Sequence, residues 1–456
     1  MRKVFLRTKM NKAAGPDCIT PRTLKIFANE LTPIFTELFN ISLARETVPK
    51  TWKASTIVPV PKKPSPSELN DYRPVALTSV VMKSMERAVL SHLTDVTDTQ
   101  MDPMQFAYRK ARGTDDACAE LIYQIFEHLE MQGNYVRLLF VDFSSAFNTM
   151  LPSVLVDKLS TMSVSSSLCR WILNYLRDRS QRVRIGNTYS RSINTNIGAP
   201  QGCVLSPVLF THYTDEYRGN SPHSFTIKYA DDTAIIGLVN KDADEIHYRR
   251  AVEDFVARCD QEGLILNVKK TKEMVIDFQK KQSDKTPLTI KGETIEQCEQ
   301  YKYLGLTISK NLTWDAHCET SKKKAMKKLY YLRTLKKFRL PPQILEAFYS
   351  ATIVSTMTYG IVVWGAGTTA LCNRKLNRIR NACSRIIGKT VKSLEDIHHE
   401  RTLKFAKKII KDPTHPLSSK FSLLPSQRRY RIPKLRTNRL KNSFVCSAIR
   451  LLNNSN

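Results

Sequence analysis

Residues 225–239 read FTIKYADDTAIIGLV, which is two apolar runs on either side of an acidic pair. The runs 225–230 and 233–239 are separated by two residues, Asp231 and Asp232, which is the spacing of a β-hairpin. Because Asp forms turns readily, the pair alone fits an ordinary hairpin turn. Adjacent carboxylates also repel each other, and bound cations would relieve that repulsion. The hairpin therefore leaves a structural and a metal-binding interpretation open.

A further acid follows another apolar strand. Residues 135–143 read YVRLLFVDF, a β-rich run with Asp142 next to its end. Three carboxylates can share two Mg²⁺ ions about 3.5–4 Å apart, the arrangement that clamps the attacking and leaving oxygens of a phosphoryl transfer. We therefore expect Asp142, Asp231 and Asp232 to converge on one concave surface.

The other elements are predicted from apolar spacing and from helix-start and turn residues. Helices are expected from Thr20–Pro21 onward and over 77–93, 114–130, 167–177 and 245–262, and strands over 52–61, 182–186, 274–278 and 289–290. After residue 305 the pattern becomes helical and basic, which places a domain boundary near residues 310–320.

The charge of the chain is large and uneven. There are 71 Lys and Arg against 42 Asp and Glu, and residues 315–456 hold 30 of the former and 7 of the latter, an excess of 23. Such a concentrated excess favours a polyanionic partner, usually nucleic acid, over a merely solvated basic face. Residues 322–338 predict a basic helix that packs on one side and follows phosphates with the other. Residues 428–441 are also basic and are expected to contact RNA with little sequence preference.

Composition excludes several classes of protein. With 42% hydrophobic and 25% charged residues the chain is neither disordered nor, with 15 Gly, collagen-like. Its ten Cys include no C-x-x-C pair, which argues against a structural zinc site and fits reduced thiols inside a cell. The longest apolar stretch, residues 349–367, contains Ser, Thr and Gly, so we expect it to be buried in the protein and expect no membrane contact.

The acidic motifs belong to a longer series. Residues 229–232 (YADD) resemble the Y/F-x-D-D box of reverse transcriptases, 141–147 (VDFSSAF) their first catalytic motif, and 199–207 (APQGCVLSP) their P-Q-G motif. Further matching motifs are Gly15–Asp17, Trp52–Lys53, Pro59–Lys62, Asp71–Thr78, Asn267 with Lys270–Lys272, and Tyr303–Gly305. The order of these motifs along the chain and the residues within them resemble the LINE-type, non-LTR retrotransposon family, in particular its jockey-like branch.

The resemblance implies a fold and a domain order. The expected fold is α+β, the right-hand polymerase fold of fingers, palm and thumb, with a helical basic C-terminal region. The expected domains are an N-terminal extension (1–50), fingers and palm (51–310), a helical thumb (311–400) and a basic C-terminal tail (401–456). No endonuclease precedes the motifs and no RNase H acid cluster follows them, so we expect the polymerase part of a larger element.

The resemblance also assigns the acids and the cofactor. Asp142, Asp231 and Asp232 are the expected catalytic residues and the ligands of two Mg²⁺ ions, with Mn²⁺ as an alternative. In that assignment Asp142 and Asp231 are the principal ligands and Asp232 is auxiliary. Lys270 and Lys272 are both candidates for the acid that protonates pyrophosphate, and the sequence does not choose between them.

Five residues are expected to bind the incoming nucleotide. Lys62 and Arg73 resemble the residues that hold the triphosphate, and Gln201 and Gly202 resemble the motif beside the nucleotide. Phe147 resembles the aromatic residue that blocks a 2′-hydroxyl, because a bulky apolar ring gives that hydroxyl no partner and little room. Phe147 therefore favours DNA synthesis over RNA synthesis.

The turn at Tyr303, Leu304 and Gly305 is expected to support the primer end. The function implied is RNA-directed DNA polymerase, with an RNA template, a DNA primer and dNTPs as partners. Two alternatives stay open: a catalytically inactive nucleic-acid-binding remnant, and an RNA-dependent RNA polymerase. The expected location is intracellular, mainly nuclear with a cytoplasmic ribonucleoprotein phase, and the sequence does not indicate an oligomeric state.

Overall fold

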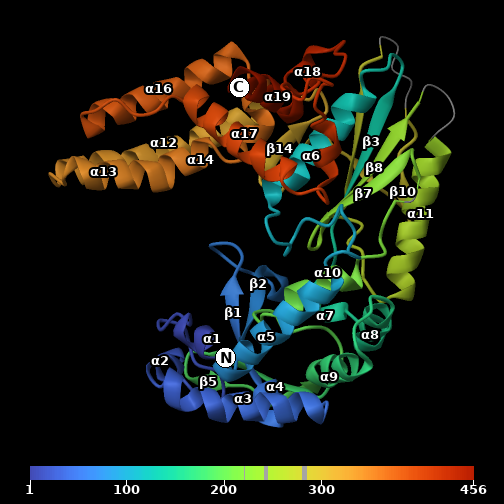
Figure 1. Cartoon of the computed structure of the whole chain (residues 1–456), viewed down its shortest axis with the longest axis vertical. Coiled ribbons are helices and arrows are strands. Elements are labelled where there is room, and N and C mark those ends of the chain that lie inside the picture. The colour runs from blue at the N-terminus through green and yellow to red at the C-terminus, as the bar shows by residue number, and fades with distance from the viewer. Residues whose placement is uncertain (220, 241–244, 280–284, 456) are drawn as a thin grey trace. The chain divides into compact units, whose positions relative to one another are not determined.

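A computed structural model describes residues 1–219, 221–240, 245–279 and 285–455. They form two compact units, each made of alternating segments of the chain and each described by itself (Figure 1). Unit 1 comprises Met1–Asp102, Phe143–Tyr217 and Phe255–Leu266, and unit 2 comprises Pro103–Asp142, Arg218–Asp254 and Asn267–Asn456. The predicted domains were defined by their expected roles, whereas these two units are defined by compactness. The predicted domain boundaries therefore stay predictions.

Unit 1 combines helices with a small mixed sheet. Its helices are α1 (Arg2–Leu6), α2 (Pro21–Ile26), α3 (Ala28–Ala44), α4 (Lys50–Lys53), α5 (Val80–Thr97), α7 (Ala146–Thr149), α8 (Pro152–Thr161), α9 (Ser166–Leu176) and α10 (Ser206–Tyr213), with a 3₁₀ turn η1 (Leu69–Asp71). Its strands are β1 (Ser55–Pro61), β2 (Tyr72–Thr78), β4 (Arg179–Ile185), β5 (Thr188–Tyr189) and β6 (Ile193–Thr195).

The helix predicted from Thr20–Pro21 is confirmed at its start and interrupted soon after. The Thr20 side chain accepts a hydrogen bond from the Thr23 amide, as an N-cap does, and Pro21 opens α2. The chain then departs from helical geometry at Phe27 before α3 begins, so the apolar spacing continues across a break. Leu24 of α2 is buried, whereas Ile34 of α3 is 57% exposed.

The sheet of unit 1 is built around β1. β1 pairs antiparallel with β2, with Val60 opposite Arg73, and parallel with β4. The predicted strand 52–61 starts three residues late because α4 occupies its first residues. The predicted helix 77–93 likewise starts at Val80, because β2 runs to Thr78 and the Ser79 side chain caps the helix.

Unit 2 contains a five-stranded sheet and most of the C-terminal helices. Its strands are β3 (Tyr135–Val141), β7 (Ser224–Tyr229), β8 (Asp232–Val239), β9 (Lys272–Asp277), β10 (Thr289–Ile290), β11 (Glu293–Thr294), β12 (Glu296–Gln297), β13 (Gln300–Tyr303) and β14 (Leu306–Ser309). Its helices are α6 (Thr114–His128), α11 (Glu245–Gln261, of which the first part belongs here), α12 (Asp315–Lys337), α13 (Pro342–Phe348), the π-helical turn η2 (Tyr349–Val354), α14 (Ser355–Met357), α15 (Ile361–Trp364), η3 (Gly365–Gly367), α16 (Ala370–Ile387), α17 (Leu394–Ile410), η4 (Pro416–Lys420), α18 (Asn438–Lys441) and α19 (Phe444–Ser455).

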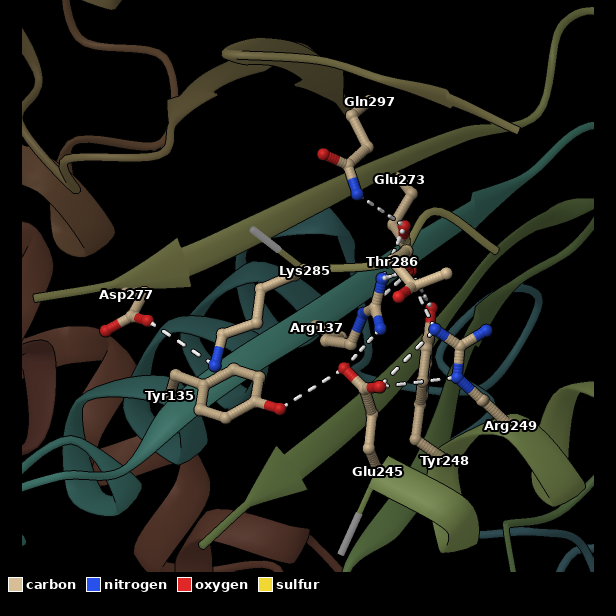
Figure 2. A network of polar contacts seen from close by, with 10 residues as sticks. All are labelled: Tyr135, Arg137, Glu245, Tyr248, Arg249, Glu273, Asp277, Lys285, Thr286 and Gln297. Carbon is tan, nitrogen blue, oxygen red and sulfur yellow. Dashed lines mark hydrogen bonds and ion pairs between the residues drawn. The ribbon is translucent and has the colours of Figure 1, made fainter. Parts of the chain in front are cut away.

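The sheet has the order β12-β9-β3-β8-β7, and its two faces have different neighbours. On β3, Val136, Leu138 and Phe140 share one face and belong to the same apolar core as α6. Arg137 points to the other face, where it meets the start of α11 (Figure 2). The alternation that defines a strand thus places the apolar core on one face of this sheet and a charged cluster on the other.

The C-terminal helices join the same core. Val445, Cys446 and Ile449 of α19 are buried with the α6 residues. Asp116 of α6 accepts hydrogen bonds from Lys408 at 2.6 Å and faces His415 at 3.0 Å. The C-terminal region, expected to be a basic tail, therefore forms a large part of the interior of unit 2.

The apolar stretch 349–367 is irregular and largely buried, as predicted, and its Ile353, Val362 and Trp364 lie in the core. No single helix among the described residues is long and apolar enough to cross a membrane. One pair bent by 48°, Pro342–Met357 with Ile361–Gly367, meets that criterion by length and composition only.

Candidate active site

Three carboxylates lie at one edge of the sheet of unit 2. Asp142 directly follows β3, and Asp231 and Asp232 stand where β7 turns into β8. β3 and β8 are antiparallel neighbours with Val141 opposite Thr233, so the next residues, Asp142 and Asp232, come side by side. The structure thus brings the three predicted catalytic acids together.

The hairpin turn lies one residue earlier than predicted. Tyr229 pairs with Asp232, so the two turn residues are Ala230 and Asp231, not Asp231 and Asp232. Ala230 has a φ of +59°, a value that favours glycine at the first position of a II′ turn. A side chain at this position strains the backbone, and such strain is concentrated at functional sites.

A buried glutamine supports the strained turn. Gln105 is fully buried, and its Oε1 accepts hydrogen bonds from the Ala230 amide at 3.3 Å and the Ala107 amide at 3.0 Å. Its neighbour Phe106 donates its amide to the Lys228 carbonyl of β7 at 2.9 Å. The segment before α6 therefore holds the acidic hairpin in place.

Two of the three acids have pKa values above the ordinary range of aspartate. Burial raises the pKa of Asp231. Burial, together with the neighbouring charges of Asp231 and Asp142, raises the pKa of Asp232 to about 6. Like charges held this close disfavour ionisation, and a bound cation would restore it.

The backbone of Asp142 is fixed from both sides by the turn that follows residue 266. Its amide donates to the Thr271 hydroxyl at 3.3 Å, and its carbonyl accepts from the Asn267 amide at 2.8 Å. The Thr271 hydroxyl in turn donates to the Asn267 carbonyl at 2.9 Å. Thr271, which stands inside the Lys270–Lys272 motif, is thus a positioning residue.

The two candidate lysines differ in their surroundings. The Nζ of Lys270 lies 4.0 Å from a carboxylate oxygen of Asp142, and its side chain is 71% exposed. Lys272 instead pairs with Glu296. The structure therefore separates two residues that the sequence left equivalent, and only Lys270 faces the acids.

The predicted turn at Leu304 and Gly305 joins β13 to β14. Both residues have positive φ, +44° and +89°, as a type I′ turn requires. The Tyr359 hydroxyl donates to the Leu304 carbonyl at 2.8 Å and lies 3.2 Å from the Thr114 hydroxyl of α6. A Cβ on Gly305 would come within 2.7 Å of the Tyr359 ring, so this position needs glycine. Tyr303 is buried in the core.

A buried ionic network joins β3, β9 and α11 (Figure 2). Arg137 donates two hydrogen bonds to Glu273, at 3.1 and 3.0 Å, and pairs with Glu245. Tyr248 also donates to Glu273, at 3.0 Å. Burial opposes the charge of Arg137, but Glu273 and Glu245 outweigh it and raise the pKa of the guanidinium. Arg137 stands five residues before Asp142 on the same strand, so the network secures the strand that carries this acid.

Lys62 and Arg73, two of the expected nucleotide-binding residues, lie in unit 1 on the β1–β2 hairpin. Lys62 follows β1, and its Nζ donates to the Asn70 carbonyl at 2.8 Å, so its charge is engaged within the hairpin. Arg73 is exposed on β2, and its side chain makes no hydrogen bond or ion pair within the described part of the chain. Of the two cations, Arg73 is the more available to a ligand.

The other three lie close together in the same unit. The Phe147 ring packs 4.8 Å from that of Phe210, and the Phe147 carbonyl accepts from the Ala199 amide just before the P-Q-G motif. The Gln201 carbonyl accepts from the Ala76 amide of β2 at 2.8 Å. Gln201 also lines a cavity of about 620 Å³ whose wall includes Arg179, Arg182 and Arg191.

Gly202 is needed for packing against β2. Its φ is +119°, and a Cβ there would lie 2.8 Å from the Ala76 carbonyl oxygen. The close backbone approach that the sequence predicted at this glycine is thus an approach to a neighbouring strand. Contact of Gly202 with a nucleotide stays a prediction.

The donor set at the acidic edge suits Mg²⁺, which prefers carboxylate oxygens. Among the residues that the structure describes, no group of three or more His, Cys, Asp or Glu side chains already surrounds one point. Val141 of β3 lies opposite Thr233 of β8, so Asp142 and Asp232, the residues next to this pair, stand at the same edge of the sheet. Burial, and after it the charges of Asp231 and Asp142, raise the pKa of Asp232 to about 6, so a cation bound here would favour its ionised form.

Sequence reasoning gave no role to four supporting residues, Gln105, Arg137, Thr271 and Tyr359, although Thr271 stands inside the matching Lys270–Lys272 motif. One of them carried a signal, because Arg137 is a charge inside an apolar strand and therefore needs a buried partner. The others support the site through contacts with residues distant in sequence. Gln105, for example, is 125 residues from Ala230.

Comparison with known proteins identifies the family. A family model described as reverse transcriptase (RNA-dependent DNA polymerase) matches residues 60–308, more than half of the chain. A second model, described as alkylated DNA repair protein alkB homolog 8, N-terminal, matches residues 314–355.

Curated relatives are proteins of mobile elements. The chain is 26% identical over 394 residues to the probable RNA-directed DNA polymerase from transposon BS of Drosophila melanogaster, covering 83% of this chain and 43% of that protein. It is 23% identical over 396 residues to the RNA-directed DNA polymerase from mobile element jockey of the same species, covering 83% and 42%. The chain thus spans less than half the length of these curated relatives.

Among solved structures, apo telomerase from Candida tropicalis aligns with 85% of this chain and 67% of its own, at 12% identity and a TM-score of 0.43. That likeness is too weak to argue from. The family match confirms the predicted α+β right-hand polymerase fold, and the mobile-element relatives confirm the predicted resemblance to jockey-like elements. The chain belongs to the reverse transcriptase family.

Proposed function

We propose that the chain is the polymerase region of a non-LTR retrotransposon protein and that it copies RNA into DNA. The observation that carries this proposal is the meeting of Asp142, Asp231 and Asp232 at one sheet edge, beside a strained turn. Neighbouring carboxylates repel each other, and bound cations would compensate that repulsion. Two-metal nucleotidyl transfer uses two such cations.

In this proposal Asp142 and Asp231 hold two Mg²⁺ ions and Asp232 assists, with Mn²⁺ as an alternative. The chemistry that such ions supply is a lowered pKa of the primer 3′-hydroxyl and neutralisation of charge on the triphosphate and pyrophosphate. The contribution of the protein is to fix the acids, through Thr271 and Asn267 around Asp142 and through the hydrogen bond that Gln105 accepts from the acidic turn.

Lys270 is the proposed proton donor to the leaving pyrophosphate. Its ammonium group lies 4.0 Å from the Asp142 carboxylate and is exposed, so it can reach a ligand held there. Lys272 is engaged with Glu296 and is a structural residue in this proposal.

The proposed partners are an RNA template, a DNA primer and dNTPs. Arg73 is proposed to hold the triphosphate, because its guanidinium has planar paired donors and no internal partner among the described residues. Lys62 is then a secondary contact. Phe147 is proposed to exclude the 2′-hydroxyl, with Gln201 and Gly202 beside the bound nucleotide and the Leu304–Gly305 turn under the primer end.

The test is extension of oligo(dT) on poly(rA) with dTTP and Mg²⁺. Asp142→Asn and Asp231→Asn should abolish extension and leave RNA binding nearly unchanged, because the basic helices of unit 2 are untouched. Asp157→Asn, an exposed acid on α8, is the matched control and should extend normally. Extension by Asp142→Asn at the rate of the control would refute the metal assignment.

The same assay separates the remaining alternatives. No extension by the unmodified chain, with RNA still bound, would indicate an inactive remnant. Faster incorporation of NTPs than of dNTPs would indicate an RNA polymerase.

We also propose an intracellular location, mainly nuclear with a cytoplasmic ribonucleoprotein phase. The ten cysteines are all free thiols, which supports a reducing compartment. Imaging of a tagged chain would test the nuclear part of this proposal.

A further inference from the structure

A fully buried glutamate lies inside unit 1, on helix α5. Glu86 has no exposed surface, and its neighbours on the same side of the helix, Met82, Met85 and Val89, are apolar and buried. A carboxyl group in such surroundings costs free energy unless hydrogen bonds replace its contacts with water. An apolar side chain of similar size would fill the same space without this cost, so the hydrogen bonds of Glu86 indicate its role.

The Glu86 carboxyl group binds the backbone of the P-Q-G motif. Its Oε2 accepts hydrogen bonds from two consecutive amides, those of Val204 and, at 3.1 Å, Leu205. These amides stand directly before α10, at a place where the helix offers its own backbone donors no carbonyl partner. Glu86 thus joins α5 to a loop that lies 118 residues further along the chain.

The same loop is fixed on its other side by strand β2. The Gln201 carbonyl accepts from the Ala76 amide at 2.8 Å, and Gly202 packs against the Ala76 carbonyl. The Cys203 thiol lies 3.7 Å from the Thr78 hydroxyl at the end of β2. Because only one residue separates β2 from α5, a single corner of the chain holds the loop from both sides.

The surroundings of Glu86 disfavour two other roles. Its side chain has no exposed surface, so it cannot exchange a proton with a bound substrate. It forms no ion pair among the described residues, because Arg179, whose charge acts on it, donates instead to the Tyr175 carbonyl at 2.9 Å. Its second oxygen, Oε1, makes no hydrogen bond within the described part of the chain, so its contacts there are the two loop amides.

We propose that Glu86 is a positioning residue for the incoming nucleotide: it holds the loop of residues 199–205 so that Gln201 stays beside β2, the strand that carries Arg73. The inference rests on the proposed function, in which Gln201 and Arg73 contact the dNTP, and adds to it a residue that touches no substrate. Without this acceptor, two loop amides lose their partner and β2 alone holds the loop.

The test is extension of oligo(dT) on poly(rA) at varied dTTP. Glu86→Leu should raise the KM for dTTP about 5- to 10-fold, the factor that corresponds to the net free energy of one hydrogen bond, with smaller changes in kcat and in the KM for primer–template. Glu86→Gln keeps an acceptor oxygen and should raise the KM for dTTP much less. Glu86→Asp is one carbon shorter, so it should resemble Glu86→Leu, and it provides the test if the leucine variant does not fold.

A double variant tests whether Glu86 acts through the loop. Gln201→Ala should raise the KM for dTTP by itself, and adding Glu86→Leu should then raise it by a smaller factor than in the unmodified chain, because the positioned side chain is gone. Equal factors in the two backgrounds would overturn the inference. Asp95→Leu removes an exposed acid of the same helix and is the matched control, which should leave these constants unchanged.

Hydrogen exchange gives a readout that does not need activity. In Glu86→Leu the peptide that contains the Val204 and Leu205 amides should exchange faster, while peptides of α3 and α9 keep their protection. Faster exchange throughout unit 1, or a lower kcat with an unchanged KM for dTTP, would indicate general destabilisation and overturn the inference. If the unmodified chain does not extend primers, the proposed function fails, whereas unchanged exchange of the loop peptide in Glu86→Leu refutes the hold of Glu86 on the loop.

Discussion

Removing the guanidinium of Arg137 should unfold unit 2 more readily than any surface change, and the structure indicates by how much. Arg137 and Glu273 both have side chains with no exposed surface and share two hydrogen bonds. Breaking a buried pair by removing one partner costs about 3–5 kcal/mol, because a charge stays buried without its partner. Glu273 keeps donors in Tyr248 and Gln297, so we expect Arg137→Met to lie near the lower end of that range.

The assay is urea unfolding of the unmodified chain, Arg137→Met and the double variant Arg137→Met/Glu273→Gln. The double variant removes the buried charge altogether, so it should be more stable than Arg137→Met by about 2 kcal/mol. Arg249→Met is the matched control, since the side chains of Arg249 and its partner Glu245 are both partly exposed, so the substitution should cost less than about 1 kcal/mol. If the double variant is no more stable than Arg137→Met, then the guanidinium acts through its packing over Tyr248, and the electrostatic reasoning is refuted.

Three further outcomes are expected. Phe147→Val should raise kcat/KM for NTPs more than it lowers that for dNTPs, since it opens space for a 2′-hydroxyl; a parallel fall of both in steady-state extension would make Phe147 a packing residue only. Tyr359→Phe loses the hydrogen bond to Leu304 and should raise the KM for primer–template several-fold with little change in kcat, whereas a fall in kcat alone would contradict a role at the primer end. Burial raises the pKa of Glu120 to about 7, so between about pH 4.5 and 7 the folded chain holds a proton there that the unfolded chain has released. Stability should therefore fall as the pH rises through this range. Thermal unfolding at pH 5 and 8 should show that Glu120→Gln removes this loss.

The parts of the site that the sequence predicts are those fixed by local pattern. The apolar runs around Asp142 and around the Asp231–Asp232 pair predict strands, and the structure confirms both strands and places their acids at the same edge of the sheet. The turn position was wrong by one residue because Ala230 takes a conformation for which a sequence normally supplies glycine. Gln105 stabilises that conformation from far upstream, and no local pattern contains such a contact.

Long-range partners account for the rest of what the sequence did not predict. Asp116 and Lys408 are 292 residues apart, and the excess of positive charge near the C-terminus gave no indication that part of it has partners inside the protein. Lys420, for example, pairs with Glu127 of α6, and Arg439 lies over the Phe278 ring at 3.8 Å. A basic segment in solvent and a basic helix packed in the protein have similar compositions. The acids that pair with the packed helix lie elsewhere in the chain, so local composition does not distinguish the two.

The core shared by β3, α6 and α19 determines when this protein can fold during its synthesis. Val136 and Leu138 leave the ribosome about three hundred residues before Val445 and Ile449, with which they share one apolar core. At roughly 5–20 residues per second, that interval lasts about 15–60 s. During this time β3 and α6 are present while α19, which shares their core, has not been synthesised, so the nascent chain exposes apolar surface and is open to aggregation or to chaperones. A premature stop codon that removes only α19 would leave Asp142, Asp231 and Asp232 in the product and still prevent completion of the core beneath their strands.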